Sequence, residues 1–168
     1  MLYNLDYPSP LGKITVVSDG DSIIALWFEE QKHFGLDSCE CADGEGVPAI
    51  ISAVKWLDCY FSGGIPDFIP PLAPISPTPF RKAVLMELMK IPYGKTTTYG
   101  EIAKAVAGAM GREKMSAQAV GGAVGNNPIS LIIPCHRVIG ADGSLTGYDG
   151  GVWRKKALLE MEKGVSLG

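Results

Sequence analysis

A cysteine followed directly by a histidine is the feature of this sequence best suited to chemistry. A largely apolar stretch, residues 128–134, leads to Cys135, His136 and Arg137. A free thiol has a pKa of about 8.5, so a sulfur nucleophile needs a base or a positive charge nearby to raise its thiolate fraction. His136 and Arg137 could supply both, and a bridging water could carry the proton between the neighbouring side chains. The alternative to a nucleophilic site is a purely structural pair, in which a buried cysteine lies beside a histidine of the core.

The residues before the cysteine predict how it is held. The apolar run indicates a strand, and Pro134 disfavours helix before the cysteine and fixes the direction of the chain. We therefore expect Cys135 on a rigid turn at the end of a strand.

The first half of the chain predicts a small α/β domain. Segments 1–7, 11–18 and 22–29 are rich in Val, Ile, Leu and aromatic residues and are separated by turn residues, which predicts an antiparallel sheet. Residues 31–48 show no clear period, whereas residues 49–61 have helical spacing and should pack on the sheet. Six prolines between residues 62 and 79 predict a linker. We expect domains at 1–79 and 80–168.

The second half predicts a mainly α, winged helix-turn-helix-like domain. An apolar face runs from Phe80 to Ile91, and the following Pro92 and Gly94 should end that helix. Two short helices are expected over 99–106, capped by Thr97 or Thr98, and over 117–124, capped by Ser116. Their connection, residues 107–114, is longer than is usual for this motif. The second of these helices is nearly all small residues, which also suits tight packing in a core.

Composition and charge narrow the function. Hydrophobic residues make up 46% of the 168 residues and charged ones 20%, which is typical of a folded protein. The net charge of −3 conceals an asymmetry: residues 1–79 carry three Lys/Arg and eleven Asp/Glu, whereas residues 80–168 carry twelve and seven. Only the second half is therefore expected to meet a polyanion. No segment predicts a membrane span or a secretory signal, so we expect a cytoplasmic protein.

Several motifs in order resemble the O6-alkylguanine-DNA alkyltransferase (methylated-DNA-protein-cysteine methyltransferase) family. The core is residues 132–139 (IIPCHRVI), supported by 91–94 (IPYG), 98–103 (TYGEIA), 119–123 (AVGGA) and the pair Gly147-Tyr148. The resemblance covers residues 80–164 almost continuously, and the first half fits only through residues 9–12 (SPLG). It implies repair of O6-alkylguanine, with O4-alkylthymine as a further candidate substrate, by irreversible transfer of the alkyl group to a cysteine.

The resemblance also implies roles for individual residues. Cys135 becomes the alkyl acceptor, His136 its water-mediated base, and Glu162 the carboxylate that orients the histidine. Asn127 would hold the turn before the active-site loop, and Tyr99 would donate a hydrogen bond to guanine N3. The substrate pocket would be lined by Val138, Tyr148 and Asp149. A thioether has no easy hydrolytic exit, so each molecule should act once.

The partner implied is duplex DNA that contains the alkylated base, approached through the minor groove with the nucleotide extruded. The expected contacts are Ser116, Ala117, Gln118, Ala119 and Gly121 on the small-residue helix and Arg112, Lys114, Lys95 and Arg137 at phosphates. Gln118 stands where the family usually places an arginine that fills the gap left by the extruded base. This departure predicts weaker DNA binding or weaker base extrusion unless Arg112 or Lys114 compensates.

Other functions stay open at this stage. A lesion-binding protein without repair activity would lack the acceptor cysteine, whereas this chain has Cys135. A Cys-His hydrolase would need an oxyanion hole, which no motif indicates. A transcription factor would need long polar side chains on its recognition helix, which here is nearly all small residues. No cofactor is expected. Zinc could in principle be bound by His33, Cys39, Cys41 and Cys59, but the spacing of these residues is not that of a zinc finger, so we expect no metal. The protein is also expected to be a monomer.

Overall fold

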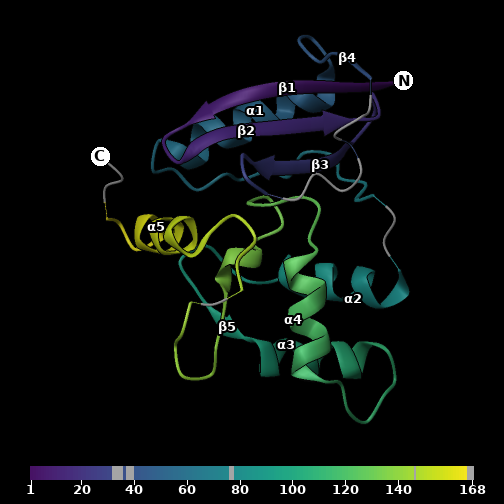
Figure 1. The fold of residues 1–168 in the computed structure, drawn as a ribbon, viewed down its shortest axis with the longest axis vertical. Coiled ribbons are helices and arrows are strands. Elements are labelled where there is room, and N and C mark those ends of the chain that lie inside the picture. Colours follow the sequence, from purple (N-terminus) through teal and green to yellow (C-terminus); the bar gives the residue numbers. More distant parts are fainter. Residues whose placement is uncertain (32–35, 37–39, 76–77, 146, 166–168) are drawn as a thin grey trace. The chain divides into compact units, whose positions relative to one another are not determined.

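The computed structural model describes residues 1–31, 36, 40–75, 78–145 and 147–165. The described chain forms two compact units (Figure 1). The first comprises residues up to 75 together with 128–132, and the second comprises 78–127 and 133–165. Residues 128–132 thus belong to the first unit although they follow most of the second unit in the sequence.

A four-stranded sheet forms the first unit. Strands β1 (Leu2–Ser9), β2 (Gly12–Ser18) and β3 (Ile23–Phe28) pair antiparallel in sequence order, as the sequence predicts. A short fourth strand, β4 (Cys41–Asp43), pairs parallel with β1, so the sheet is mixed and has the order β3-β2-β1-β4. The three-stranded antiparallel part of the sheet is the predicted one, and β4 is an addition that the sequence did not indicate, because a three-residue strand is too short to show an alternating pattern.

Helix α1 (Pro48–Phe61) packs against β1, β2 and β3, as predicted. Pro48 occupies its first turn, where the missing backbone N–H would have no intrahelical acceptor. The side chains that it buries follow helical spacing: Ala49, Ile50, Ala53, Trp56, Leu57 and Tyr60. A second apolar cluster of the unit contains Val17, Ile24, Ala25 and Trp27.

The outer edge of β3 is covered by two separate segments of the chain. Ile23 N–H donates to Pro71 O at 2.7 Å, and Ala73 N–H donates to Ile23 O at 2.8 Å. Further along, Leu26 N–H donates to Pro128 O and Ser130 N–H to Leu26 O, both at 2.9 Å. This pairing hides an edge that would otherwise be open to other chains.

The predicted strand before Cys135 is not formed. Ile129 makes one isolated bridge to Leu26, and residues 130–133 are turns and bends. Leu131 has φ 68°, a left-handed conformation that costs a non-glycine residue about 1 kcal/mol or more and that breaks an extended chain. The apolar run is explained by burial against β3 rather than by strand pairing.

The second unit contains the three helices α2 (Pro79–Leu88), α3 (Tyr99–Ala109) and α4 (Ala117–Gly125), which pack on one another. Thr78 caps α2, so Pro79 is its first residue rather than part of the linker. The predicted caps are confirmed: Thr98 and Glu101 form a capping box on α3, and the Ser116 side chain accepts from Ala119 N–H on α4. These helices give the helix-turn-helix arrangement that the sequence predicts.

The remaining elements of this unit surround the Cys-His segment. Strands β5 (Thr97–Thr98) and β6 (Val138–Ile139) pair parallel, and a 3-10 turn, η1 (Cys135–Arg137), lies directly before β6. Helix α5 (Val152–Glu162) packs on η1. The sequence pattern does not predict α5, because the buried face of this helix combines Leu158, Leu159 and Met161 with Arg154, Lys155 and Glu162 and so lacks a continuous apolar stripe. Among the described residues, no helix is long and apolar enough to span a membrane.

Candidate active site

Cys135 lies on a tight turn that starts from Pro134. Pro134 has φ −80° and ψ 65°, the conformation of an inverse γ-turn, and Cys135 N–H donates to Ile133 O at 2.8 Å. The next turn follows at once, with Arg137 N–H donating to Pro134 O at 3.0 Å. The predicted rigid turn is therefore present, and it is built from local hydrogen bonds. Cys135 itself is 5% exposed.

Asn127 fixes this turn from the end of α4. Its buried side-chain amide donates to Ile133 O at 2.9 Å, one residue before Pro134. A hydrogen bond between the Asn127 side chain and the thiol also favours the thiolate of Cys135. The residue thus acts on both the backbone and the sulfur.

Burial sets the protonation state of the thiol. It raises the pKa of Cys135, and the Asp149 carboxylate raises it further. The hydrogen bond from Asn127 and the positive charge of Lys155 act in the opposite direction. Because burial dominates, the thiol of the resting protein is protonated at neutral pH and needs a base before it can attack.

The positive charge that lowers the pKa of the Cys135 thiol belongs to Lys155. It lies on α5 and is only 1% exposed, and burial lowers its pKa while the Cys135 charge raises it. Its Nζ lies 5.8 Å from the centre of the Tyr99 ring. A buried ammonium beside a buried thiol favours the thiolate during the reaction.

Behind the cysteine, His136 belongs to a buried network centred on Glu162. His136 Nε2 lies 2.6 Å from Glu162 Oε2, and both side chains are essentially inaccessible to solvent. Arg137 donates to the same carboxylate through Nε at 2.8 Å and Nη2 at 3.2 Å, and Gly94 N–H donates to Oε1 at 3.1 Å. Two-point binding by a guanidinium favours the ionised form of Glu162.

An ionised Glu162 determines the tautomer of His136. The carboxylate can only accept, so His136 donates from Nε2–H and keeps Nδ1 as its basic nitrogen. Burial lowers the pKa of His136, while the hydrogen bond and charge of Glu162 raise it. The imidazole is therefore neutral at rest and able to take up a proton.

Tyr99 is brought to the cysteine by the first turn of α3. Burial raises the pKa of its phenol, and the Cys135 charge raises it further, so the hydroxyl keeps its proton. A Cβ added to Gly147 would lie 3.5 Å from this hydroxyl, and one added to Gly121 would lie 3.8 Å from the ring. Both distances are ordinary van der Waals contacts, so these two glycines lie against Tyr99 and form part of its surroundings.

The three residues expected to line the pocket lie in the segment after the cysteine. Val138 on β6 and Tyr148 are buried, and Asp149 is half-buried and close enough to affect the thiol. They belong to the same unit as Cys135, Tyr99 and Lys155.

Most of the residues predicted to face DNA are exposed. At the start of α4 these are its N-cap Ser116 and Ala117, Gln118 and Ala119, and elsewhere they are Lys95, Arg112 and Lys114. Gly121 is half-buried beside Tyr99. Arg137 is used inside the protein: its guanidinium binds Glu162 and Ile91 O (2.8 Å) and lies over the Tyr93 ring. The prediction that Arg137 contacts phosphate is therefore not supported by its position.

Sequence reasoning missed Lys155. Its neighbour Lys156 is 67% exposed, and composition alone does not distinguish the two. The spacing of Lys155, Leu158, Leu159 and Glu162 on one helical face is the signal that could have found it. In the described part of the chain, no group of three His, Cys, Asp or Glu side chains could hold a metal ion. His33 and Cys39 lie outside the described residues.

Two family models match the chain, one for each half. Residues 79–164 match the 6-O-methylguanine DNA methyltransferase DNA-binding domain, and residues 1–74 match the ribonuclease-like domain of the same proteins. Together the matches cover nearly the whole sequence.

Individual relatives agree over similar lengths. A methylated-DNA--protein-cysteine methyltransferase of Haemophilus influenzae is 39% identical, with 96% of this chain and 87% of the relative covered. The crystal structure of the Mycobacterium tuberculosis O6-methylguanine methyltransferase is 41% identical, with a TM-score of 0.84 over 98% of this chain and 94% of that one. That of Mycobacterium tuberculosis OGT in complex with DNA is 41% identical, with a TM-score of 0.81 over the same shares of the two chains. The chain therefore belongs to the 6-O-methylguanine DNA methyltransferase family.

Proposed function

We propose that this protein repairs O6-alkylguanine in duplex DNA by transferring the alkyl group irreversibly to Cys135. The observation that carries the proposal is the buried thiol with a neutral His136 hydrogen-bonded to the Glu162 carboxylate behind it and with Tyr99 and Lys155 beside it. The names of its relatives support the same reaction.

The first step needs a thiolate. His136 would accept the thiol proton through a water molecule, and Glu162 would stabilise the imidazolium that forms. Lys155 and Asn127 would stabilise the sulfur anion, since both favour the thiolate of Cys135. The thiol remains protonated, and so protected from other electrophiles, until a substrate is in place.

The second step is displacement at the alkyl carbon. The sulfur forms a bond to that carbon while the carbon–O6 bond breaks, and the electron pair passes to the guanine ring. Tyr99 would stabilise this charge by donating a hydrogen bond from its hydroxyl to guanine N3, and its raised pKa keeps the proton on that hydroxyl. Val138, Tyr148 and Asp149 would surround the alkylated base.

DNA is the macromolecular partner, and we propose that α4 enters the minor groove. Its exposed first turn, residues 116–119, offers small side chains and one amide, Gln118, which suits close approach and insertion into the base stack. Extrusion of the nucleotide then presents O6 to the buried cysteine. Action as a monomer in the cytoplasm and activity on O4-alkylthymine stay predictions from the sequence.

The proposal is tested by counting repaired bases. Duplex DNA containing O6-methylguanine is incubated with increasing amounts of protein, and guanine and O6-methylguanine are quantified after DNA digestion. We expect one guanine restored per molecule of protein, with no further turnover. Binding without loss of O6-methylguanine would instead indicate a lesion-recognition protein, and continued turnover would indicate a hydrolase.

A further inference from the structure

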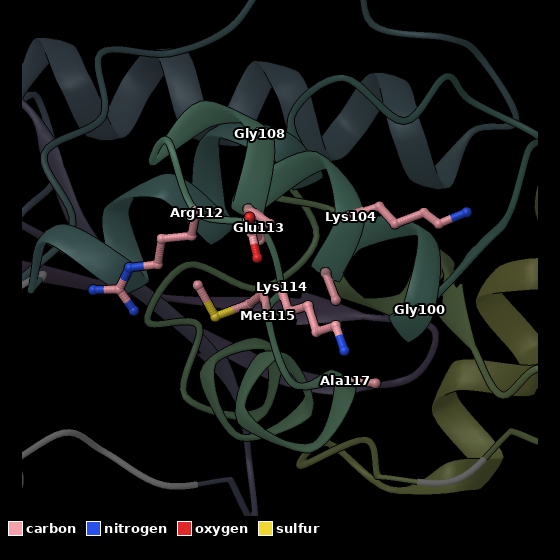
Figure 2. Close-up of a pocket in the computed structure, with 10 residues that line it drawn as sticks. Gly100, Lys104, Gly108, Arg112, Glu113, Lys114, Met115 and Ala117 are labelled. Carbon is pink, nitrogen blue, oxygen red and sulfur yellow. The ribbon is translucent and has the colours of Figure 1, made fainter.

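The turn between α3 and α4 borders a hollow whose lining carries more positive than negative charge. The hollow has a volume of about 480 Å³ and is lined by Gly100, Ala103, Lys104, Ala107, Gly108, Arg112, Glu113, Lys114, Met115 and Ala117. Three of these side chains are cations and one, Glu113, is an anion. Figure 2 shows Lys104 and Arg112 extending from opposite sides of the hollow, with Lys114 between them.

The turn is held in shape by the end of α3. Arg112 N–H donates to Ala107 O at 2.8 Å and Gly111 N–H donates to Gly108 O at 3.3 Å, the two hydrogen bonds of a Schellman motif. Gly111 has φ 67°, the left-handed conformation that this motif requires. The backbone therefore fixes where Arg112 leaves the helix, and the cationic turn is part of the folded structure.

The helix that follows this turn, α4, carries no charge of its own. None of the nine residues of α4 is charged, so the helix proposed to enter the groove cannot itself neutralise phosphate. The nearest cations in the sequence are Lys114 and Arg112, and Ala117 of α4 lines the same hollow. Any charge that attracts DNA to this helix must come from its flanks.

We infer that Lys104, Arg112 and Lys114 bind successive phosphates of one DNA strand that runs across this hollow beside α4. The cations diverge rather than point to one centre, which suits an extended polyanion better than a single small anion. The volume is larger than one phosphate group needs and has room for the sugars between phosphates. This inference rests on the proposed function only in requiring that α4 meets DNA.

The test measures DNA affinity by fluorescence anisotropy for the wild type and the variant K104Q/R112Q/K114Q, on undamaged and O6-methylguanine duplexes over a range of salt concentrations. All three side chains are exposed, so the variant should fold normally, which circular dichroism checks. We expect the slope of log affinity against log salt to fall by about 0.9 for each phosphate that the variant no longer neutralises. At about 0.1 M salt this corresponds to roughly eightfold weaker binding per phosphate, equal for the two duplexes.

Two matched variants sharpen the test. Lys163→Gln removes one exposed cation after the end of α5 and should leave the slope unchanged, whereas Glu113→Gln removes the one anion of the hollow and should strengthen binding. A triple variant whose slope equals that of the wild type would overturn the inference, and so would a Lys163→Gln change in slope as large as one third of the triple variant's. Competition by inorganic phosphate at constant ionic strength would also overturn it, because it would indicate a site for one small anion.

Alkyl transfer is measured separately. The quantity measured is the amount of alkyl group carried by Cys135 after the wild type has been incubated with saturating O6-methylguanine duplex. If the wild type binds DNA as described but transfers nothing, the proposed function fails while this inference stands.

Discussion

Glu162→Gln probes the buried network most severely, because four hydrogen bonds converge on this carboxylate. Three come from the charged or polar side chains of His136 and Arg137 at 2.6, 2.8 and 3.2 Å, and the fourth comes from Gly94 N–H at 3.1 Å. Glutamine has the same shape, but its NH2 group faces donors, and it leaves Arg137 as a buried cation without a counter-charge. Removing one partner of a buried ion pair typically costs about 3–5 kcal/mol. We expect a loss of that size.

Hydrogen exchange of peptides from α5, followed by mass spectrometry, measures this loss in the unit that contains the network. The matched variants are Arg137→Met and the double variant R137M/E162Q. Because the double variant buries no unpaired charge, it should be clearly more stable than the sum of the single effects predicts. A Glu162→Gln loss below about 1 kcal/mol, or additive effects in the double variant, would refute the buried charged network.

Three further predictions follow from the site. Burial lowers the pKa of His136, so below about pH 6.5 the unfolded state binds a proton that the folded state does not. The free energy of unfolding should therefore fall by up to about 1.4 kcal/mol per pH unit on acidification. Urea unfolding should show a flatter pH dependence for His136→Gln. Lys155→Met removes a charge that favours the thiolate, so iodoacetamide labelling of Cys135 should need higher pH while stability is kept; an unchanged labelling profile would exclude this role. Gly111→Ala should cost about 1 kcal/mol in urea unfolding, since only its positive φ opposes a side chain there.

Local signals in the sequence predicted much of the fold. Thr98 and Ser116 marked two helix starts correctly, because a cap depends on a side chain and a backbone group only three residues away. The turn at Cys135 followed from Pro134 for the same reason. The three antiparallel strands were visible because each is long enough to show a pattern.

Long-range interactions account for what the sequence did not reveal. Residues 128–130 look like a strand leading to the cysteine, yet they lie along the edge of β3, about a hundred residues away in the chain. Arg137 looks like a surface cation until Glu162 is placed beside it. Lys155 and Lys156 are identical residue types in one helix, and only the packing of α5 decides that Lys155 is buried. Charged residues on a buried face also hid α5 itself.

The central claim, irreversible transfer to Cys135, is tested most directly by the intact mass of the protein after incubation with a duplex containing O6-methylguanine. We expect a single mass increase of about 14 Da, mapped to the peptide that contains Cys135, at most one per molecule and absent from Cys135→Ser. An unmodified protein after complete binding of the lesion, or an adduct on another residue, would contradict the account.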